Sequence, residues 1–454
     1  MYNKKYHIHF VGIGGIGMSG MAELLLNLGY RVSGSDIKST EITRRLTGLG
    51  GQVFEGHQAQ NITGADVVVV SSAVPASNPE CIKAKKEMIP VIPRGEMLAE
   101  LMRLKYGVAV AGAHGKTTTT WIISYVIQQG GLDPTMVIGG KLASLGSNAR
   151  LGQGEFIVAE ADESDGSFLR LSPTIAVVTN IDAEHLDYYT DLEMIKKVFL
   201  DFINKVPFYG MAVLCLDNTG IQEIIPLVEK RFVTYGLTSQ ADFQARNVRF
   251  EGLTSCFQVV HQETVLGEIC LNLPGQHNVY NAMASVIVAL ELGISFDRVA
   301  AALNRIEGVQ RRLEIKGSCN EMTVVDDYGH HPTEIKMTLE AVRHSWPGRR
   351  LVVVFQPHRY SRTSALFEEF TRSFYQADEL LVLPIYAAGE EPIDGVSGEA
   401  LYEGIHRHGH RQVSFHDSHA SALAYLKEYM RAGDIVLTLG AGDVWKVGEA
   451  LLDT

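Results

Sequence analysis

Gly112-Ala113-His114-Gly115-Lys116-Thr117-Thr118 is the segment that indicates the class of fold most specifically. It follows an apolar run at 107–111 and precedes a helix predicted over 117–129, which ends at two glycines. Main-chain N–H groups of such a loop cradle phosphates, its lysine reaches the β and γ oxygens, and a threonine hydroxyl binds Mg²⁺. The strict P-loop pattern needs a glycine where Val110 stands, so the loop is a shortened variant. Because G-K-T between a strand and a helix is uncommon by chance, we predict a P-loop domain.

Carboxylates follow the next predicted strand, at 156–159. Glu160 ends that strand, and it is followed by Asp162, Glu163 and Asp165. Ligands of open α/β sheets bind outside the carboxyl ends of the strands. Glu160 is therefore expected to face the P-loop threonine and to complete the oxygen shell of a hard cation. The alternative is a solvated acidic loop, which the neighbouring P-loop makes the minority interpretation.

A second glycine loop stands near the N-terminus. Gly12-Ile13-Gly14-Gly15-Ile16-Gly17 fits G-x-G-x-x-G, between the predicted strand at 7–11 and a helix that runs to about residue 28. The loop offers free N–H groups and a positive helix end to a diphosphate. Asp36 ends the second strand, where a dinucleotide site places its ribose-binding acid. NAD, a UDP-sugar and a turn needed only for packing all remain open, and the motif indicates a diphosphate more securely than nicotinamide.

The chain of 454 residues is too long for one hydrophobic core. Short β-branched runs alternate with helical segments in three blocks, which is typical of parallel α/β domains. Alternating segments between about 245 and 273 indicate antiparallel strands. We therefore predict an α/β fold with an N-terminal Rossmann-like domain at 1–105, a central P-loop ATPase-like domain at 106–312 and a C-terminal Rossmann-like domain at 313–454. The central sheet is expected to be mostly parallel, with a small antiparallel portion.

Composition excludes several classes of partner. Lys and Arg number 40 against 52 Asp and Glu, a net charge of −12, which argues against binding nucleic acid or an anionic membrane. The five cysteines show no CxxC pair, so we expect reduced, mostly buried thiols. No signal-peptide pattern and no bilayer-spanning apolar run are present. We expect a cytoplasmic protein.

Several motifs together resemble the Mur ligase family over nearly the whole chain. The shortened P-loop, the acidic segment at 160–165 and the segment at 179–187 resemble the family's central domain. Pro274-Gly275-Gln276-His277-Asn278-Val279-Tyr280-Asn281 resembles its adenine segment, and Arg312-Leu313-Glu314 resembles the entry to its third domain.

Three other segments indicate which branch of the family the chain resembles. The segments at 12–19, 326–332 and 355–362 are similar to the branch that adds L-alanine to UDP-N-acetylmuramate. The branch that recycles the murein tripeptide is a closer alternative than the branches that add D-glutamate, diaminopimelate or D-Ala-D-Ala. Several relatives carry a carbamylated lysine where Phe199 stands, so no modified lysine is expected.

The resemblance implies an activity and a set of partners. ATP would activate the lactyl carboxylate of UDP-N-acetylmuramate as an acyl phosphate, which L-alanine then attacks, in peptidoglycan precursor synthesis. It assigns the first glycine loop to UDP, the central domain to ATP and the third to the amino acid. The expected cofactors are ATP and Mg²⁺, as two ions, with Mn²⁺ as an alternative. A monomer or weak homodimer is expected.

The motifs and the resemblance give the following candidate residues. For ATP they are Gly112, Ala113, His114, Gly115, Lys116, Thr117, Thr118, His277, Asn278, Asn281, Arg312 and Asp327. For the UDP-sugar they are Gly14, Gly15, Ile16, Gly17, Met18, Ser19, Asp36 and Ser71. For the amino acid they are Tyr328, His330, His358, Arg359 and Arg362. The catalytic candidates are Lys116, Glu160 and His185, and the metal candidates are Thr117, Glu160 and His185.

Two other classes of function compete with the ligase. A dinucleotide-dependent oxidoreductase would use the first glycine loop but leaves the P-loop and Glu160 without a role. A P-loop switch or motor would use the second loop but leaves the first one and the third domain unexplained. Binding of NAD(P)H would favour the first alternative, and ATP hydrolysis without any other substrate would favour the second.

Overall fold

A computed structural model describes residues 5–71, 73–138, 149–185, 188–319 and 321–453. These residues form two compact units. The first contains residues 1–182, 193–243 and 284–299, and the second contains residues 183–192, 244–283 and 300–454. Within the described residues, no helix is both long enough and apolar enough to cross a membrane.

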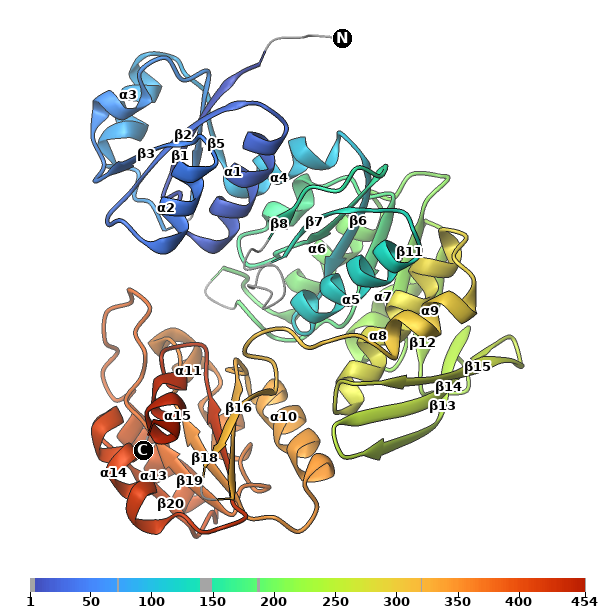
Figure 1. The fold of residues 1–454 in the computed structure, drawn as a ribbon, viewed down its shortest axis with the longest axis vertical. Coiled ribbons are helices and arrows are strands. Elements are labelled where there is room, and N and C mark those ends of the chain that lie inside the picture. Colours follow the sequence, from blue (N-terminus) through green and yellow to red (C-terminus); the bar gives the residue numbers. More distant parts are fainter. Residues whose placement is uncertain (1–4, 72, 139–148, 186–187, 320, 454) are drawn as a thin grey trace. The chain divides into compact units, whose positions relative to one another are not determined.

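The N-terminal part of the first unit is a five-stranded parallel sheet in the order β3-β2-β1-β4-β5 (Figure 1). β1 lies between β2 and β4, and the connections that follow β1 and β4 run to opposite sides of the sheet, so a switch point lies between the carboxyl ends of these two strands. Such a point is where open α/β sheets bind ligands. The strands are β1 (His7–Val11), β2 (Arg31–Asp36), β3 (Gln52–Glu55), β4 (Val67–Val70) and β5 (Val91–Pro93). The helices are α1 (Ile16–Asn27), α2 (Glu41–Gly48), α3 (Pro79–Lys86) and α4 (Arg94–Met102).

The rest of the first unit is built on a second sheet, in which the strand order is β12-β11-β10-β6-β9-β7-β8. All neighbours are parallel except β7 and β8. β6 lies between β10 and β9, so the loops that follow these three strands share one edge. The strands are β6 (Tyr106–Ala111), β7 (Thr135–Val137), β8 (Ala149–Arg150), β9 (Phe156–Glu160), β10 (Ile175–Val178), β11 (Met211–Cys215) and β12 (Phe232–Gly236). The helices are α5 (Lys116–Gln129), α6 (Leu192–Ile203) and α7 (Thr219–Ile224).

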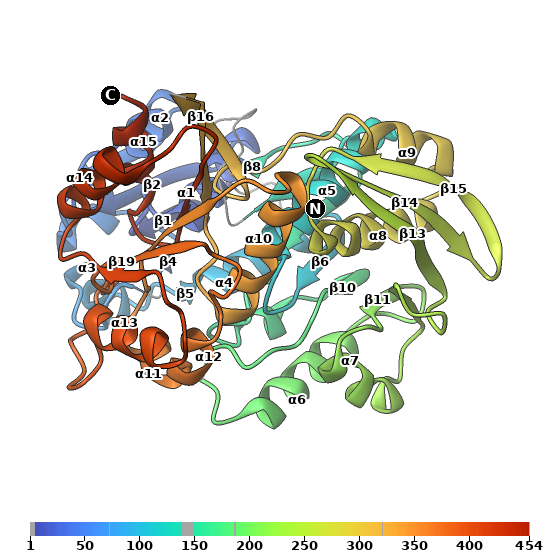
Figure 2. The same cartoon turned by 90° about the horizontal axis from the view of Figure 1, so that it is seen from below.

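Three consecutive antiparallel strands precede α8 (Gln276–Glu291) in the chain. Figure 2 shows β13 (Phe243–Glu251), β14 (Thr254–His261) and β15 (Thr264–Leu271) side by side. The helices α8 (Gln276–Glu291) and α9 (Phe296–Leu303) follow them in the chain. The register places Cys256 directly opposite Cys270, and the two form a disulfide. The prediction that all five cysteines are reduced is therefore wrong, because pairing depends on strand register and not on local spacing.

The C-terminal sheet has six strands in the order β16-β17-β21-β18-β19-β20. β16 and β17 pair antiparallel, and all other neighbours are parallel. The strands are β16 (Glu314–Cys319), β17 (Met322–Asp327), β18 (Leu351–Phe355), β19 (Glu379–Val382), β20 (Val413–Phe415) and β21 (Ile435–Leu439). The helices are α10 (Pro332–Ser345), α11 (Tyr360–Ala365), α12 (Phe367–Thr371), α13 (Gly398–Arg407), α14 (His419–Tyr429) and α15 (Trp445–Leu452).

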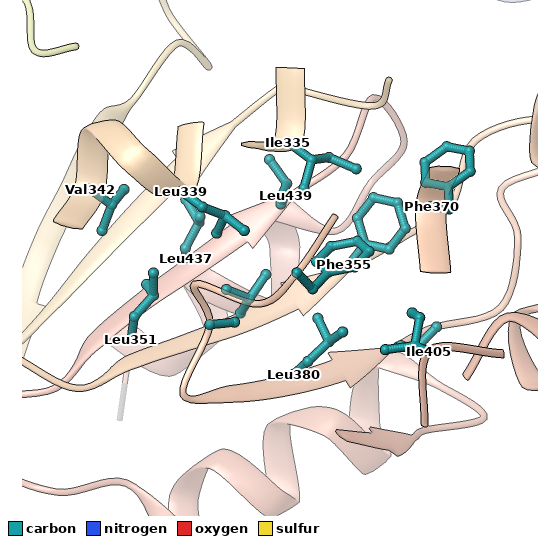
Figure 3. Close-up of a cluster of buried hydrophobic side chains, with 14 of the residues drawn as sticks. Ile335, Leu339, Val342, Leu351, Phe355, Phe370, Leu380, Ile405, Leu437 and Leu439 are labelled. Atoms are coloured by element: carbon teal, nitrogen blue, oxygen red, sulfur yellow. The ribbon is translucent and has the colours of Figure 1, made fainter. Parts of the chain in front are cut away.

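The core of this sheet holds the ends of its strands in place. Figure 3 shows side chains of α10, among them Leu339, over β18 and β21. Phe355, the last residue of β18, is fully buried against Phe370 and Phe374, with ring centroids 5.9 and 4.9 Å away. Burying a side chain of this size contributes about 1.5–3 kcal/mol. The loop that starts at Gln356 therefore leaves the sheet from a firmly packed point.

The predicted fold class is confirmed: the chain is a three-part α/β protein with mostly parallel sheets and small antiparallel portions. The predicted antiparallel segment corresponds to β13, β14 and β15. β16 was not predicted, because its short sequence carries no alternation strong enough to separate it from a loop. β21 begins at Ile435, and the carboxylate of Asp434 just before it accepts hydrogen bonds from Arg350 and from the N–H of Arg431.

Candidate active site

The P-loop leaves β6 and enters α5 through two glycines with positive φ. Gly112 has φ +139°, and a Cβ there would lie 2.1 Å from Oγ1 of Thr179. Gly115 precedes the helix with φ +79°. A side chain is strained in both conformations, and at Gly112 it would also collide with the end of β10. The glycines thus allow the loop to turn tightly beside the neighbouring strand.

The end of β10 fixes the shape of the P-loop. Asn180 accepts a hydrogen bond from the N–H of His114 at 2.8 Å and donates one to the carbonyl of His114 at 3.0 Å. Thr179 donates to the same carbonyl at 2.6 Å. The His114 ring lies 3.0 Å from Oδ2 of Asp182. The loop is therefore held from outside by a frame of side chains before any ligand binds.

Lys116 and Thr117 both meet carboxylates from the acidic segment. Nζ of Lys116 donates to Oε1 of Glu163 at 2.7 Å and to the carbonyl of Gly112 at 2.6 Å. Oγ1 of Thr117 donates to Oε2 of Glu160 at 2.9 Å. The prediction that Glu160 faces the P-loop threonine is confirmed. Glu163 is 2% exposed, so the acidic segment is not a solvated loop at this residue.

The donor set around Thr117 suits a hard divalent cation. A threonine hydroxyl and a carboxylate at the end of a strand are oxygen ligands of the kind that Mg²⁺ takes beside a nucleotide. Their contact shows that one ion could meet both groups. His185, the third candidate ligand, belongs to the second unit and has φ +57°. Residues 186 and 187, which follow it in the family motif, lie outside the described residues.

The first glycine loop lies at the carboxyl ends of β1, β2 and β4. The N–H groups of Gly12 and Ile13 donate to the carbonyl of Ser35 at 2.8 and 3.0 Å. The N–H of Gly14 donates to Oδ2 of Asp36 at 2.8 Å. Ser71 follows β4, and a Cβ on Gly12 would lie 3.5 Å from it. The loop, Asp36 and Ser71 are therefore brought together, as predicted for one ligand site.

A cavity of about 230 Å³ opens beside Asp36. The residues that line it are Asp36, Lys38, Ser39, Thr43, Arg44, Thr47, Val53, Phe54 and Glu55. Met18 and Ser19 are buried in α1, at 1% and 6% exposure, so their side chains do not face such a cavity. The side chain of Ile16 lies outside the part of the chain that the structure describes.

Arg94, at the start of α4, was missed by the sequence analysis. A Cβ on Gly17 would lie 2.9 Å from its Nη1, so that glycine leaves room for the guanidinium. Nη2 of Arg94 donates to Oδ2 of Asp162 at 2.7 Å. Burial opposes ionisation of Asp162, but Arg94 and Lys116 outweigh it and lower the pKa of Asp162. No local motif marks Arg94, because its partners are distant in the sequence.

In the second unit, the candidate adenine residues lie at the start of α8. Asn278 donates from Nδ2 to the carbonyl of Pro274 at 2.8 Å, and Asn281 donates to Oδ1 of Asn278 at 3.1 Å. Both are buried, so they order this segment. Burial and nearby Arg312 lower the pKa of His277 to about 4, although Glu334 partly opposes them. His277 is therefore a neutral ring near neutral pH.

Asp327 and Arg312 differ in their surroundings. The Asp327 carboxylate accepts hydrogen bonds from the N–H of Leu313 at 2.8 Å, the N–H of Gly329 at 2.7 Å and Oγ1 of Thr338 at 3.1 Å. Burial raises the pKa of Asp327, although Arg312 and these donors oppose the rise. Arg312 lies over the ring of Tyr328, 5.2 Å from its centroid. Asp327 thus organises the main chain, while Arg312 remains on the surface of the site.

The amino-acid candidates converge after β17 and β18. The rings of Tyr328 and His330 lie 5.4 Å apart, and those of His330 and His358 lie 5.8 Å apart. Arg362 donates from Nη1 to Nδ1 of His358 at 3.2 Å and from Nη2 to Oε1 of Glu184 at 3.2 Å. The cavity here measures about 150 Å³ and is lined by Ala183, Glu184, His185, Arg359, Ser361, Arg362, Ala365 and Leu366. It is small and cationic, which suits a small amino acid.

Burial is the main reason that His358 stays neutral. It lowers the pKa of His358 to about 3, and the neighbouring His330, Arg362 and Arg359 act in the same direction. Nδ1 of this neutral ring can then accept the proton that Arg362 donates. His358 is consequently a hydrogen-bond acceptor that orients Arg362, and its ring does not take up a second proton at neutral pH.

The position of the family's modified lysine is occupied by Phe199, which is 1% exposed and packs edge-on against Phe168, 5.4 Å away. The nearby Lys196 is paired through Nζ with Glu193 at 2.7 Å and with Glu223. These two carboxylates favour a charged ammonium, since they raise the pKa of Lys196. The absence of a carbamylated lysine remains a prediction.

Three domain models of the Mur ligase family match the chain. The "Mur ligase family, catalytic domain" matches residues 7–106, the "Mur ligase middle domain" matches residues 110–289, and the "Mur ligase, glutamate ligase domain" matches residues 311–442. The UDP-N-acetylmuramate–L-alanine ligase of Desulfosudis oleivorans is 64% identical over 452 residues, which cover 100% of this chain and 99% of that protein. The ligase of the same name from Desulfatibacillum aliphaticivorans is 63% identical over 452 residues, with the same coverage.

Solved structures share the fold. The crystal structure of UDP-N-acetylmuramate–alanine ligase from Thermotoga maritima has a TM-score of 0.82 and 29% identity, and it covers 99% of this chain and 98% of that one. A murein peptide ligase from Psychrobacter arcticus has a TM-score of 0.72 and 24% identity over the same shares of the two chains. The second likeness concerns the fold alone.

Proposed function

The chain belongs to the Mur ligase family, and we propose that it uses ATP to join L-alanine to the lactyl carboxylate of UDP-N-acetylmuramate. This would be a step of peptidoglycan precursor synthesis. The observation that carries the proposal is the shortened P-loop, where Lys116 and Thr117 meet Glu163 and Glu160. The full-length relatives that are 64% and 63% identical carry the name of this activity and support L-alanine over a tripeptide.

Lys116, Thr117 and Glu160 would perform the phosphoryl transfer. A carboxylate and a triphosphate repel one another, so catalysis depends on positioning and on charge neutralisation. Lys116 would exchange its contact with Glu163 for the β and γ oxygens of ATP. A Mg²⁺ ion, when bound, supplies further positive charge at those oxygens, and Thr117 and Glu160 would hold it. We propose two ions in all, with Mn²⁺ as an alternative metal.

The chemistry proceeds in two steps. An oxygen of the lactyl carboxylate attacks the γ-phosphorus, the bond to the β–γ bridging oxygen breaks, and ADP leaves. The neutral amine of L-alanine then attacks the acyl carbon, and inorganic phosphate leaves from the tetrahedral intermediate as the amide forms. The amine must first lose a proton from its ammonium form, and His330 is the candidate base because its Nε2 lies 3.7 Å from Glu184, which lines the pocket of Arg359 and Arg362.

We assign the remaining candidates by the chemistry of their sites. The first glycine loop, with Gly14, Gly15, Gly17, Asp36 and Ser71, would bind the UDP part, since it leads into the N-terminus of α1, and a helix N-terminus offers N–H groups and a positive dipole end to a diphosphate. Further main-chain groups of that site are those of Ile16, Met18 and Ser19. Nucleotide contacts are assigned to Gly112, Ala113, His114, Gly115, Thr118, His277, Asn278, Asn281, Arg312 and Asp327. The amino acid is assigned to Tyr328, His330, His358, Arg359 and Arg362.

The domain boundaries near residues 105 and 312 are likewise proposed. The first family domain model ends at residue 106, the second runs from 110 to 289, and the third begins at 311. These limits support the division into 1–105, 106–312 and 313–454. We propose that the protein acts in the cytoplasm, because its substrates are nucleotides and an amino acid. We also propose that it is a monomer or a weak homodimer.

Phosphate release from ATP tests the proposal. It should be measured with Mg²⁺ alone, with UDP-N-acetylmuramate, with L-alanine, and with both substrates together. Sustained release only with both substrates is the expected result. Rapid ATP hydrolysis with neither substrate would contradict it and would favour a P-loop switch, and binding of NAD(P)H would favour an oxidoreductase.

A further inference from the structure

Arg359 has a main-chain conformation that few non-glycine residues adopt. Its φ is +69° and its ψ is +139°, between β18 and α11. Conformations in such sparsely populated regions persist only where the surrounding structure enforces them, and they are concentrated at ligand-binding sites. What holds Arg359 in place therefore bears on the direction in which its guanidinium points.

The loop that follows β19 supplies the first part of that support. The N–H of Tyr386 donates to the carbonyl of Pro357 at 2.8 Å, and the N–H of Arg359 donates to the carbonyl of Tyr386 at 2.9 Å. The rings of His358 and Tyr386 stack, 5.6 Å apart and 8° from parallel. The main chain on both sides of His358 is thus attached to residue 386.

Glu390, four residues further on, supplies the second part. Its Oε1 accepts a hydrogen bond from Oγ of Ser361 at 2.6 Å, and its Oε2 accepts one from the N–H of Ser361 at 3.0 Å. Its carboxylate also lies 3.9 Å from Nη1 of Arg359. Burial opposes the charge of Glu390, but Ser361 and Arg359 outweigh burial and lower the pKa of Glu390. One carboxylate thus contacts the two residues on either side of Tyr360.

We propose that Glu390 is a positioning residue for the amino-acid substrate, acting through Ser361 and Arg359. It would hold the segment from His358 to Arg362 so that both guanidinium groups point into the small cationic cavity. This inference rests on the proposed function, because it takes that cavity as the site of the L-alanine carboxylate. A two-pronged ion pair between guanidinium and carboxylate depends on orientation, so a small rotation of the segment weakens it.

The alternative is that Glu390 only stabilises the fold. Its loop lies outside the hydrophobic core of this sheet: Ala388 and Gly389 are exposed, and neither belongs to the core cluster that includes Phe355. The contacts of Glu390 fall on the binding segment itself. A structural role predicts a lower Tm, whereas a positioning role predicts a selective change in the KM for L-alanine.

Glu390→Gln is the test variant, because an amide keeps the size of the side chain but loses the charge and one acceptor. Glu391→Gln is the matched control, since Glu391 is the next residue, is exposed, and makes no side-chain hydrogen bond or ion pair with the residues that the structure describes. The KM values for L-alanine, ATP and UDP-N-acetylmuramate, together with kcat and Tm, should be measured for both variants and for the unchanged protein. Glu390→Asp tests rescue by a carboxylate.

Glu390→Gln is expected to raise the KM for L-alanine roughly tenfold, the effect of losing a charge-assisted hydrogen bond. The KM values for the two nucleotides should stay within about twofold, and Glu390→Asp should recover part of the loss. Equal changes in all three KM values, or a lower Tm with an unchanged KM for L-alanine, would overturn the inference. If Glu390→Gln does not fold, Ser361→Ala removes one of the same contacts, and the same selective rise decides the question.

The role of Glu390 and the proposed function can be tested separately. If the unchanged protein shows no L-alanine dependence, the proposed function fails before any variant is compared. If it depends on L-alanine and Glu390→Gln behaves like Glu391→Gln, the proposed function stands and the role of Glu390 is rejected.

Discussion

Lys116 donates a hydrogen bond across 2.7 Å to Glu163, a carboxylate that is 2% exposed. The P-loop lysine is therefore already oriented by a buried anion on the segment that follows β9. A triphosphate carries the same kind of charge, so a lysine held in this way needs only to exchange one anionic partner for another. The pair ties the phosphate-binding loop to the acidic segment.

Lys116→Ala is expected to reduce phosphate release by roughly a hundredfold or more, because it removes the charge that stabilises the transferring phosphoryl group. It should also lower Tm, since it leaves Glu163 buried without its cation. Release assays and thermal unfolding measure the two effects. Lys197→Ala, at an exposed lysine of α6, is the control. Phosphate release by Lys116→Ala at the rate of the control would remove Lys116 from the mechanism.

Glu160→Gln is expected to raise the Mg²⁺ concentration required for half-maximal activity, by roughly tenfold or more, because a neutral amide is a weaker ligand for a hard cation. The measurement is a Mg²⁺ titration of the rate at saturating substrates. Glu155→Gln is a suitable control, as Glu155 is exposed and precedes the opposite end of the same strand. A Mg²⁺ requirement that Glu160→Gln leaves unchanged would exclude Glu160 as a ligand.

His358 should make the protein less stable in acid. Burial, with His330 and Arg362, lowers the pKa of His358 to about 3 in the folded protein, against about 6.5 in an unfolded chain. Between these values the unfolded chain binds a proton that the folded one does not, so stability falls as the pH falls from about 6.5 towards 3. His358→Gln removes that titration.

The Tm of His358→Gln is therefore expected to fall less steeply than that of the unchanged protein between about pH 6.5 and pH 4.5. Thermal unfolding at a series of pH values gives both slopes. His406→Gln, at an exposed histidine of α13, controls for the loss of an imidazole. Parallel Tm curves for His358→Gln and the unchanged protein would show that His358 is not held neutral.

Cys256 and Cys270 should be protected from alkylation until the protein is reduced. Denatured without reductant, the chain is expected to expose three thiols, those of Cys81, Cys215 and Cys319. Reduction should raise the number of labelled cysteines to five, which intact-mass measurement counts directly. The closed loop spans a sequence separation of 14, and a loop of this size stabilises a fold by about 3 kcal/mol. Five labelled thiols before reduction would show that the pair is reduced in the isolated protein.

The parts of the site that the sequence predicts are those built from neighbouring residues. Gly112 and Gly115 stand in the P-loop because local turn geometry requires them, and Glu160 lies at a strand end that the apolar pattern marks. Such features can be identified from a single sequence because the strand, the turn and the helix are each specified by neighbouring residues.

The parts that the sequence does not predict depend on contacts between distant segments. Glu163 is 47 residues from Lys116, and Glu390 is 29 residues from Ser361. An acidic residue on a loop looks the same in the sequence whether it is solvated or holds a binding segment. The pairing of Cys256 with Cys270 depends in the same way on strand register, which only the folded sheet defines.

Product mass, with competing substrates, tests the proposed reaction most directly. The protein should be incubated with ATP, Mg²⁺, UDP-N-acetylmuramate and an equimolar mixture of L-alanine, D-glutamate and a murein tripeptide. The expected product is UDP-N-acetylmuramate heavier by one alanine residue, formed in equal amount with ADP and phosphate. A product carrying D-glutamate or the tripeptide would keep the chain in its family but contradict the proposed substrate, and ATP consumption without any new amide would contradict the ligase itself.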